Sequence, residues 1–239
     1  NGCCAVGPLR LFCAGQRGSD AMDDETTPPD SKLTRSKQRW ASEHKFLTGA
    51  VVRPEDQRLP PGQHLVRDWP VLDLGRQPDV SHARWRLKIS GLVERPVTLD
   101  WAGFLALPQV DLRTDIHCVT TWSRYDNDWA GVATRDLLDL VIPRDEAAFV
   151  MLHGYDGYTT NVPLGDFAAA GALLARGWAG EPLARGPGGP ARLVIPHLYF
   201  WKSAKWLSGI EFLGADKAGF WEVNGYHMRG DPWGEERYG

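Results

Sequence analysis

The chain is organised around one short stretch, Asp115-Ile116-His117-Cys118-Val119-Thr120-Thr121-Trp122. Cys118 is the only cysteine after residue 13. Apolar Val110 and Leu112 alternate with polar residues before it, and small polar residues follow it, so we expect a strand that ends in a loop at this cysteine. A thiol in such a place can be a metal ligand, a nucleophile or a small buried apolar group, and the stretch alone leaves all three open.

The composition argues against several classes of function. The 239 residues carry a formal net charge of −3 without a basic stripe, which gives no electrostatic support to nucleic-acid binding. No run approaches the roughly 18 consecutive apolar residues of a membrane-spanning helix, so we predict no membrane span. The 11 tryptophans predict a large cavity or interface built from wide, flat side chains.

Cysteine usage is compatible with a reducing compartment. The other three cysteines lie near the start of the chain: Cys3, Cys4 and Cys13. The rest of the sequence therefore has no disulfide framework. The apolar patch within residues 1–21 is too short and too interrupted for a secretory signal, and no arginine pair marks twin-arginine export. We therefore expect a cytoplasmic protein.

The chain divides into a tail and one domain. Residues 1–21 are expected to be non-native or upstream sequence, because Met22 is the first methionine. Residues 14–35 are polar, aperiodic and rich in Gly, Ser, Asp and Pro, which favours disorder. We predict a disordered or non-native tail and lead-in over 1–44 and a single domain over 45–239.

Hydrophobic periodicity predicts a domain built mainly on short strands. Alternating apolar and polar residues from Trp85 to Ser90 predict a half-buried strand that ends at Gly91. Two helices are predicted behind cap residues, one over 101–107 after Asp100 and one capped by Thr134 that ends before Pro143. The remaining expected elements are a helix at 36–48, an irregular edge segment at 64–71, and strands at 147–152, 158–162, 192–195 and 207–213. We therefore predict a mixed α+β fold based on β-sheet.

Polar and basic residues collect on stretches that are expected to be loops: Arg67, His117, Asp156, Tyr158, Thr160, Arg192, His197, Tyr199, Lys202, Ser203 and Lys205. Segment 196–206 places two lysines, a hydroxyl and a histidine among aromatic side chains directly after a predicted buried strand. Such a segment would bind a flat polar anion, with lysine supplying charge to a phosphate. A solvated basic turn with structural tryptophans explains the same pattern, and the residues alone leave both readings open.

Four separated motifs make the sequence recognisable: DIHCVTTWSR (115–124), HGYDGYTTNVPL (153–164), RLVIPHLYFWKSAKWL (192–207) and NGYHMRGDPW (224–233). In this order they resemble the sulfite oxidase family of molybdopterin-dependent oxidoreductases, and in particular its small prokaryotic branch. The resemblance runs from about residue 45 to residue 239. It implies a β-rich, sulfite oxidase-type molybdopterin-binding fold in a single domain, and a molybdenum–molybdopterin cofactor.

The resemblance implies a specific role for Cys118. One cysteine is the only protein ligand to molybdenum in that family, and the matching position here is Cys118. A soft thiolate suits a metal that a dithiolene cofactor already holds. Trp122 and Trp129, which flank the cysteine loop, are expected to be walls of the site.

The resemblance also implies a set of cofactor contacts. Arg67 is expected to contact the cofactor or a substrate anion, and Asp156 to hydrogen-bond the pterin. Arg192 corresponds to the family's arginine-bearing strand, and Lys202-Ser203-Ala204-Lys205 to its phosphate-binding turn. The complete predicted set is Arg67, Asp68, His117, Cys118, Asp156, Tyr158, Thr160, Arg192, His197, Lys202, Ser203 and Lys205, with Cys118 and Arg67 catalytic.

The sequence departs from the family pattern at two positions. Pro187 stands where a histidine is usual before the arginine-bearing strand, so that contact is lost or supplied elsewhere, with His197 as a candidate. Arg176 stands where an active-site tyrosine is usual. These departures leave the substrate open.

The leading hypothesis is a molybdenum-dependent oxidoreductase that performs two-electron oxo transfer. Its substrate would be a small sulfur or nitrogen oxyanion, or an S- or N-oxide. The sequence has no haem or flavin motif, so electrons are expected to pass to an unidentified partner. It indicates no oligomeric state.

Three other functions are weighed against this hypothesis. Cys118 with His117 or His153 could form a nucleophilic pair, although adjacent residues of a strand point to opposite faces. The departures at Pro187 and Arg176 leave open a non-catalytic module that binds or carries molybdopterin. A zinc site would have to use residues without close ligand spacing: His153, His197, His227 and Cys118. In the last motif, His227 and Arg229 are expected to be structural.

Overall fold

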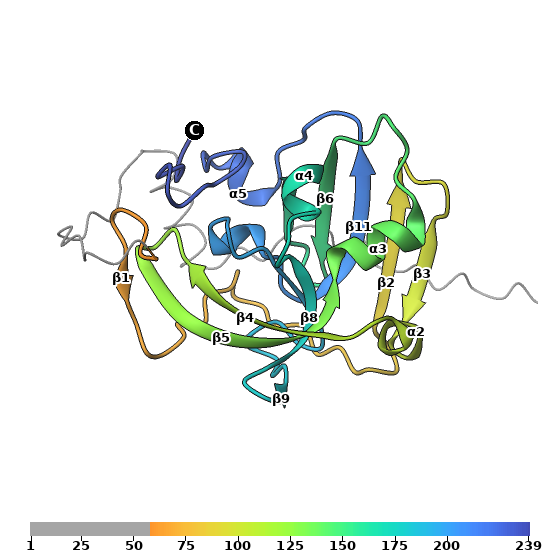
Figure 1. The fold of residues 1–239 in the computed structure, drawn as a ribbon, viewed down its shortest axis with the longest axis horizontal. Helices are drawn as coiled ribbons and strands as arrows, with labels where there is room; N and C mark the ends of the chain where they lie inside the picture. The colour runs from red at the N-terminus through yellow and green to blue at the C-terminus, as the bar shows by residue number, and fades with distance from the viewer. Residues whose placement is uncertain (1–57) are drawn as a thin grey trace, which may run out of the picture.

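Two β-sheets organise residues 58–239, the part of the chain that the structure, a computed structural model, describes (Figure 1). The first sheet has the strand order β1-β5-β8-β10, with β4 paired to β5 and β9 to β8. Its strands are β1 (His64–Leu65), β4 (Val110–His117), β5 (Trp122–Ala133), β8 (Leu173–Trp178), β9 (Glu181–Pro182) and β10 (Arg192–Val194). The predicted helix at 36–48 and the predicted boundary at residue 44 lie outside the described residues.

The second sheet has the order β3-β2-β11-β6-β7. Its strands are β2 (Arg86–Gly91), β3 (Val97–Asp100), β6 (Phe149–Gly154), β7 (Thr159–Pro163) and β11 (Leu207–Leu213). The short helices are α2 (Trp101–Ala106), α3 (Thr134–Val141), α4 (Leu164–Phe167), the 3₁₀ turn η1 (Phe200–Lys202) and α5 (Phe220–Val223). The predicted mixed, β-rich α+β fold is therefore confirmed. No helix in this region is long and apolar enough to cross a membrane.

Most predicted strands are present, with their bounds shifted by one or two residues. The strand at 85–90 is β2, and the strand at 207–213 is β11 with the predicted bounds. Helix α2 begins as expected, because the Asp100 Oδ1 accepts a hydrogen bond from the Gly103 N–H at 2.8 Å. The long strand β5 was not predicted, since a loop was expected after Cys118.

The predicted cap of the second helix is wrong. Ala133 occupies the N-cap position of α3, and Thr134 is its first helical residue. The Thr134 hydroxyl instead donates to the backbone carbonyls of Phe167 and Ala172. A buried hydroxyl has to find an acceptor, and here the acceptors belong to α4 and the segment after it rather than to α3.

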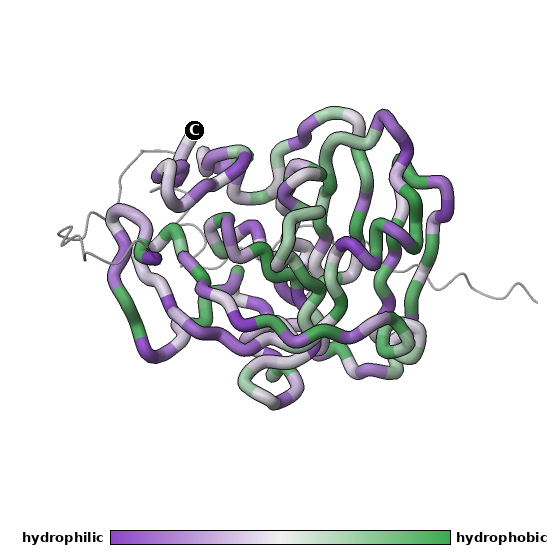
Figure 2. Tube along the Cα trace, viewed as in Figure 1, coloured by the Kyte–Doolittle hydropathy of each residue, from purple (hydrophilic) through white to green (hydrophobic). Residues whose placement is uncertain are grey.

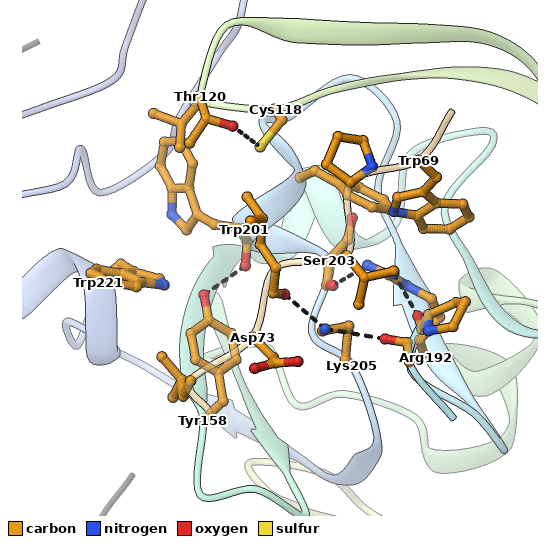
Figure 3. Close-up of a pocket in the computed structure, with 18 of the residues that line it drawn as sticks. Trp69, Asp73, Cys118, Thr120, Tyr158, Arg192, Trp201, Ser203, Lys205 and Trp221 are labelled. Carbon is orange, nitrogen blue, oxygen red and sulfur yellow. Dashed lines mark hydrogen bonds between the residues drawn. The ribbon is translucent and has the colours of Figure 1, made fainter. Parts of the chain in front are cut away.

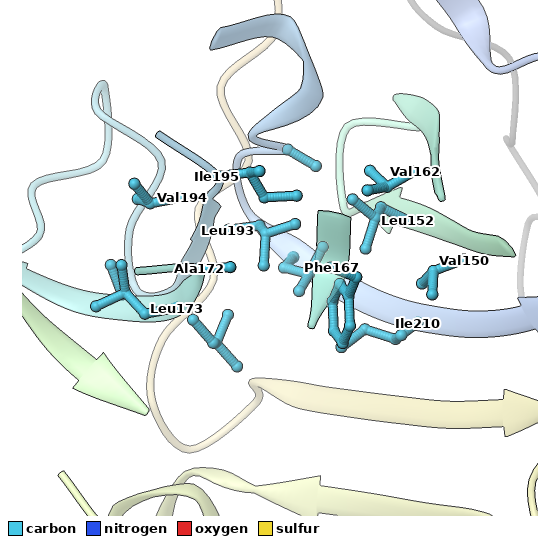
Figure 4. Packing of buried hydrophobic residues seen from close by; sticks show 14 of the residues in the cluster. Val150, Leu152, Val162, Phe167, Ala172, Leu173, Leu193, Val194, Ile195 and Ile210 are labelled. Carbon is cyan, nitrogen blue, oxygen red and sulfur yellow. The ribbon is translucent and has the colours of Figure 1, made fainter. Parts of the chain in front are cut away.

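The hydrophobic core lies between the two sheets. Figure 4 shows Val150, Leu152 and Ile210 of the second sheet in one cluster with Leu173 and Leu193 of the first, and Phe167 of α4 lies among them. Strongly hydrophobic segments run through the middle of the molecule, whereas hydrophilic segments follow much of its outline (Figure 2). This packed core gives the loops at the ends of the strands a rigid base.

Cys118 is placed by the hairpin of β4 and β5. The two strands are antiparallel and pair His117 with Ser123. Between them the Cys118 N–H donates to the Trp122 carbonyl at 2.8 Å, and the Thr121 N–H donates to the Cys118 carbonyl at 3.0 Å. Thr121 has a φ of 73°, in the left-handed region that closes so tight a turn. The strand end predicted at Cys118 is confirmed.

Candidate active site

A pocket opens beside the Cys118 turn and encloses about 820 Å³ of space, its open mouth included. Figure 3 shows Cys118 and Thr120 at one end and Arg192 and Lys205 at the other, with Trp201 between them. The pocket therefore has a thiol end and a cationic end.

The thiol end is held by the chain on several sides. Cys118 is 8% exposed, and its Sγ lies 3.1 Å from the Thr120 Oγ1. The Gln63 Nε2 donates to the Cys118 carbonyl at 3.2 Å, and the Arg237 Nη1 donates to the Val119 carbonyl at 2.7 Å. The turn therefore presents its thiol to the pocket from a fixed backbone.

His117 serves the scaffold rather than the pocket. It does not line the pocket, and its Nδ1 lies 2.8 Å from the Ser123 Oγ. Burial lowers the pKa of His117 to about 4, so the ring is neutral at pH 7. His153 pairs with Glu211 at 3.3 Å on the second sheet. Neither histidine is placed as the base of a Cys118 nucleophile.

The cationic end is built around Arg192. Its guanidinium is buried and donates to the carbonyls of Pro187 at 2.8 Å and Ser203 at 2.7 Å. It lies 4.1 Å from the centre of the Phe200 ring. No carboxylate of residues 58–239 lies within ion-pair distance of it, and burial lowers the pKa of Arg192 to about 9. Such an uncompensated charge favours an anionic ligand.

Lys205 adds a second cation to this end of the pocket. Its Nζ donates to the carbonyls of Leu72 at 2.8 Å and Gly186 at 3.3 Å. Ser203 also lines the pocket, and its Oγ accepts from the Ile195 N–H at 2.9 Å. Two of the four residues of the predicted phosphate-binding turn are therefore brought to the pocket beside Arg192.

Two carboxylates also line the pocket. The Asp156 Oδ1 accepts from the Tyr158 N–H at 3.1 Å, and burial raises the pKa of Asp156 to about 6. Tyr158, also on the lining, donates its hydroxyl to the Trp201 carbonyl at 2.7 Å. The second carboxylate, Asp73, accepts from the Gly75 N–H at 2.8 Å. Asp73 was not predicted, because an aspartate in an irregular loop carries no distinguishing signal.

Lys202 and Thr160 lie behind the wall of the pocket. The Lys202 Nζ is fully buried and contacts the Glu222 Oε1 and the Met228 carbonyl, both at 2.6 Å, and the Asn161 carbonyl at 2.9 Å. The Thr160 Oγ1 donates to the same Glu222 Oε1 at 2.8 Å. Neither residue lines the pocket, so this predicted pair belongs to a buried polar cluster that ties α5 to β7 and η1.

Three further predicted residues are not brought to the pocket. His197 lies 3.0 Å from the Asp166 carboxylate, which also accepts from Arg229 at 2.9 Å. Arg67 and Asp68 are exposed and do not line the pocket. Of the predicted set, the structure therefore gathers Cys118, Asp156, Tyr158, Arg192, Ser203 and Lys205.

The two residues that depart from the family pattern, Pro187 and Arg176, lie in different places relative to the pocket. Pro187 lines the pocket, and its carbonyl accepts a hydrogen bond from Arg192. Arg176 lies on β8 outside the lining, where its Nε donates to the Gln109 Oε1 at 2.7 Å. Arg176 therefore does not take the place of a phenol over the site.

The aromatic walls come largely from residues far along the chain. Trp201, Trp221 and Tyr226 line the pocket together with Trp69 and Trp122. The Trp201 Nε1 donates to the Glu222 Oε1 at 2.9 Å, so the buried cluster also positions this wall. The expectation for Trp122 as a wall stands, while Trp129 is buried outside the lining. The motif at 224–233 signalled this region in the sequence but did not indicate which residue faces the pocket.

Comparison with known proteins identifies relatives of this chain. The model of the oxidoreductase molybdopterin binding domain matches residues 74–221. The chain is 48% identical over 190 residues to the uncharacterized oxidoreductase YuiH of Bacillus subtilis. This alignment covers 78% of this chain and 96% of YuiH. It is 30% identical over 161 residues to the protein-methionine-sulfoxide reductase catalytic subunit MsrP of Campylobacter jejuni, covering 58% of this chain and 52% of that one.

A solved structure shows the same fold. The sulfane dehydrogenase SoxCD from Paracoccus pantotrophus superposes with a TM-score of 0.54 at 22% sequence identity, covering 58% of this chain and 40% of that one. The chain thus spans nearly the whole of YuiH but about half or less of MsrP and the SoxCD chain.

The pocket residues fit a molybdopterin cofactor. Cys118 offers a soft thiolate to a metal, and the buried Arg192 and the half-buried Lys205 offer positive charge to a phosphate at the opposite end. The Trp122 Nε1 is a buried donor without a partner in the described part of the chain, on a residue of the pocket wall. A bound group with acceptor atoms would satisfy it.

Proposed function

We propose that this chain, which belongs to the family of oxidoreductases with a molybdopterin-binding domain, transfers an oxygen atom. The proposed reaction is a two-electron reaction at the Cys118 end of the pocket. The family implies a molybdenum–molybdopterin cofactor. The observation that carries the proposal is the separation of a fixed thiol at one end of the pocket from a buried guanidinium at the other, which has no carboxylate partner among residues 58–239 (Figure 3).

Each pocket residue has a distinct role in this proposal. The Cys118 thiolate would hold the metal, and Arg192 and Lys205 would hold the phosphate. Asp156 would orient the ring system of the cofactor through its carboxylate. When bound, the cofactor would supply a metal that gives up an electron pair as it takes up an oxygen atom and accepts an electron pair as it releases one. Arg67 and Asp68 have no role here, because they are exposed outside the lining.

The lining of the pocket favours a neutral substrate over an anionic one. Of the described residues that line it, only Arg192 and Lys205 are cationic, and both lie away from Cys118. Much of the remaining lining is aromatic and includes Trp122, Trp201 and Tyr226. A small S-oxide or N-oxide with apolar substituents suits such a wall better than sulfite, whose charge would find no cation near Cys118 among the described lining residues.

The reductive reaction on a sulfoxide balances with an external electron donor. The S=O bond breaks, the oxygen leaves as water, and the sulfide is released. Two electrons and two protons are consumed. The electrons come from a redox partner that docks with the protein, and the protons come from solvent at the pocket mouth. In the oxidative direction the same balance runs in reverse, with water as the oxygen source.

The test is the molybdenum content and turnover of a Cys118→Ser variant purified from a host that makes molybdopterin. We expect about one molybdenum per chain in the wild type, and turnover at least about a hundredfold lower in the variant, because a hydroxyl is a poor ligand for this metal. Thr121→Gly is the matched control: it alters the same turn, relieves a positive φ and leaves the thiol in place.

Either of two results would count against the proposal. Full molybdenum and full turnover in Cys118→Ser would remove the thiolate from the site. Tight cofactor retention by the wild type without turnover of any sulfoxide, N-oxide or sulfite would instead support the carrier module.

The cytoplasm is the compartment that we propose. The proposed role of Cys118 requires a reduced thiol, which a reducing compartment maintains. Fractionation of cells that express the native protein tests this, and recovery in an exported fraction would contradict it.

A further inference from the structure

Tyr226 is held firmly against the pocket by its aromatic neighbours. Its ring is stacked on Trp221, with centroids 5.0 Å apart, and meets Trp201 edge to face at 5.1 Å. Its N–H donates to the Trp221 carbonyl at 3.0 Å, and its backbone pairs with Tyr238 in an isolated bridge. These contacts fix the ring, so its hydroxyl has little freedom to search for a partner elsewhere.

The hydroxyl of Tyr226 differs from those of two other tyrosines. Tyr158 donates to the Trp201 carbonyl at 2.7 Å, and Tyr155 donates to the Arg86 carbonyl at 2.8 Å. Tyr226 is only 8% exposed and lines the pocket, yet its hydroxyl makes no hydrogen bond with any residue from 58 to 239. A hydroxyl on so buried a residue is normally bonded, so an open one on a residue of the pocket lining is available to a ligand.

The same hydroxyl lies within electrostatic reach of Cys118. Burial raises the pKa of Tyr226 well above its usual value, and negative charge on Tyr238 and Cys118 raises it further. The phenol therefore remains a protonated donor at physiological pH. Thr120, the hydroxyl nearest to the thiol in sequence, is already engaged with the Cys118 Sγ at 3.1 Å.

We propose that the Tyr226 hydroxyl donates the hydrogen bond that holds the oxygen of a small S-oxide or N-oxide beside Cys118. This inference rests on the proposed function and assigns its substrate contact to the segment after α5. The oxide oxygen carries partial negative charge and accepts strongly, whereas the product sulfide or amine offers the phenol a weaker or differently placed acceptor. Tyr226 would therefore favour the oxide over the product.

The test compares Tyr226→Phe with Tyr238→Phe in molybdenum-loaded protein. Both variants remove one phenolic oxygen and keep the ring, but Tyr238 does not line the pocket. The probe is methionine sulfoxide. Three quantities are measured: molybdenum per chain, the dissociation constant of the probe from quenching of tryptophan fluorescence, and kcat/KM with a reduced viologen as electron donor.

In Tyr226→Phe we expect the wild-type molybdenum content. The dissociation constant of the probe should rise about fivefold to tenfold, because one hydrogen bond is lost, and kcat/KM should fall by at least the same factor. Tyr238→Phe should match the wild type in all three. If Tyr226→Phe keeps full molybdenum and unchanged affinity for the probe, the inference is wrong but the proposed function stands. The same holds if Tyr226→Phe loses its molybdenum while the wild type keeps it. Absence of molybdenum from the wild type would overturn the proposed function as well.

Discussion

Asp156 shows how a single buried group makes stability depend on pH. Its carboxyl is 5% exposed and lies near the Lys205 cation, but burial outweighs that attraction and raises its pKa to about 6. The unfolded chain has a pKa of about 3.9 at this residue. The folded state therefore binds the proton more tightly. Stabilisation from the protonated form is complete below about pH 4 and is lost as the pH rises through about 6.

Asp156→Asn isolates this effect, because asparagine stays neutral and can still accept from the Tyr158 N–H. We expect the free energy of unfolding of the variant, relative to the wild type, to increase by about 2 to 3 kcal/mol between pH 4 and pH 7. Urea denaturation of the cofactor-free proteins at four pH values measures it. If the two stability curves run parallel across this range, the carboxyl does not titrate as described.

At the residue scale, motif and chemistry predicted the pocket only in part. Cys118, Arg192 and Lys205 line the pocket as expected. Lys202 does not, although it is three residues from Lys205. The helical turn η1 ends at Lys202, and the chain then extends through Ser203, so the two lysines leave it in different directions. Sequence spacing could not show where that turn stops.

At the scale of elements, the buried ion pair of Lys202 and Glu222 joins α5 to η1. Both side chains are fully buried, and the two charged atoms lie 2.6 Å apart. Burial lowers the pKa of Lys202 despite this partner. Removing one charge leaves the other without compensation in the interior, which costs more than removing both.

We therefore expect Lys202→Met and Glu222→Gln each to lower the free energy of unfolding by about 3 to 5 kcal/mol. The double variant should lose less than the sum of the two, by at least about 1 kcal/mol. Chemical denaturation of the cofactor-free proteins gives the complete cycle. Glu94→Gln is the control, because its ion pair with Arg144 is exposed and should contribute less than about 1 kcal/mol. Additive losses would show that the pair is not coupled.

The predictability of the strands depended on how their two faces differ. In β2 the burial alternates along Leu87, Lys88 and Ile89, so its period was visible in the sequence. Strand β5 has charged residues and tryptophans mixed along its 12 residues, and its register shifts opposite β4 and β8. Irregular pairing disrupts the period of two, which is why a loop was expected there.

At the scale of the whole molecule, the polar groups of the pocket lower the stability of the folded, cofactor-free protein. Arg192 is buried without a carboxylate in the described part of the chain, and the Trp122 Nε1 lacks an acceptor there. A ligand that supplies both should stabilise the folded state by mass action. The fold and the chemistry of the site are thus linked through one equilibrium.

Cofactor loading should therefore raise the Tm. A ligand present at about 100 times its dissociation constant contributes about 2.7 kcal/mol, which for a domain of this size corresponds to roughly 5 to 10 °C. Scanning calorimetry of protein from hosts with and without molybdopterin synthesis measures the difference, with molybdenum content determined on the same samples. Equal Tm values in the presence of bound molybdenum would show that the cofactor does not contact the buried groups.

The order of the pocket walls along the sequence bears on the biosynthesis of the protein. A ribosome makes the Cys118 hairpin before Trp221 and Tyr226, which also line the pocket, and before Arg237, which donates to the Val119 carbonyl. At bacterial or eukaryotic elongation rates the interval lasts roughly 5 to 20 s. During that time the Cys118 side chain lacks the pocket residues that are made later. A cofactor can therefore be fully enclosed only once the segment after residue 219 has been made and has docked.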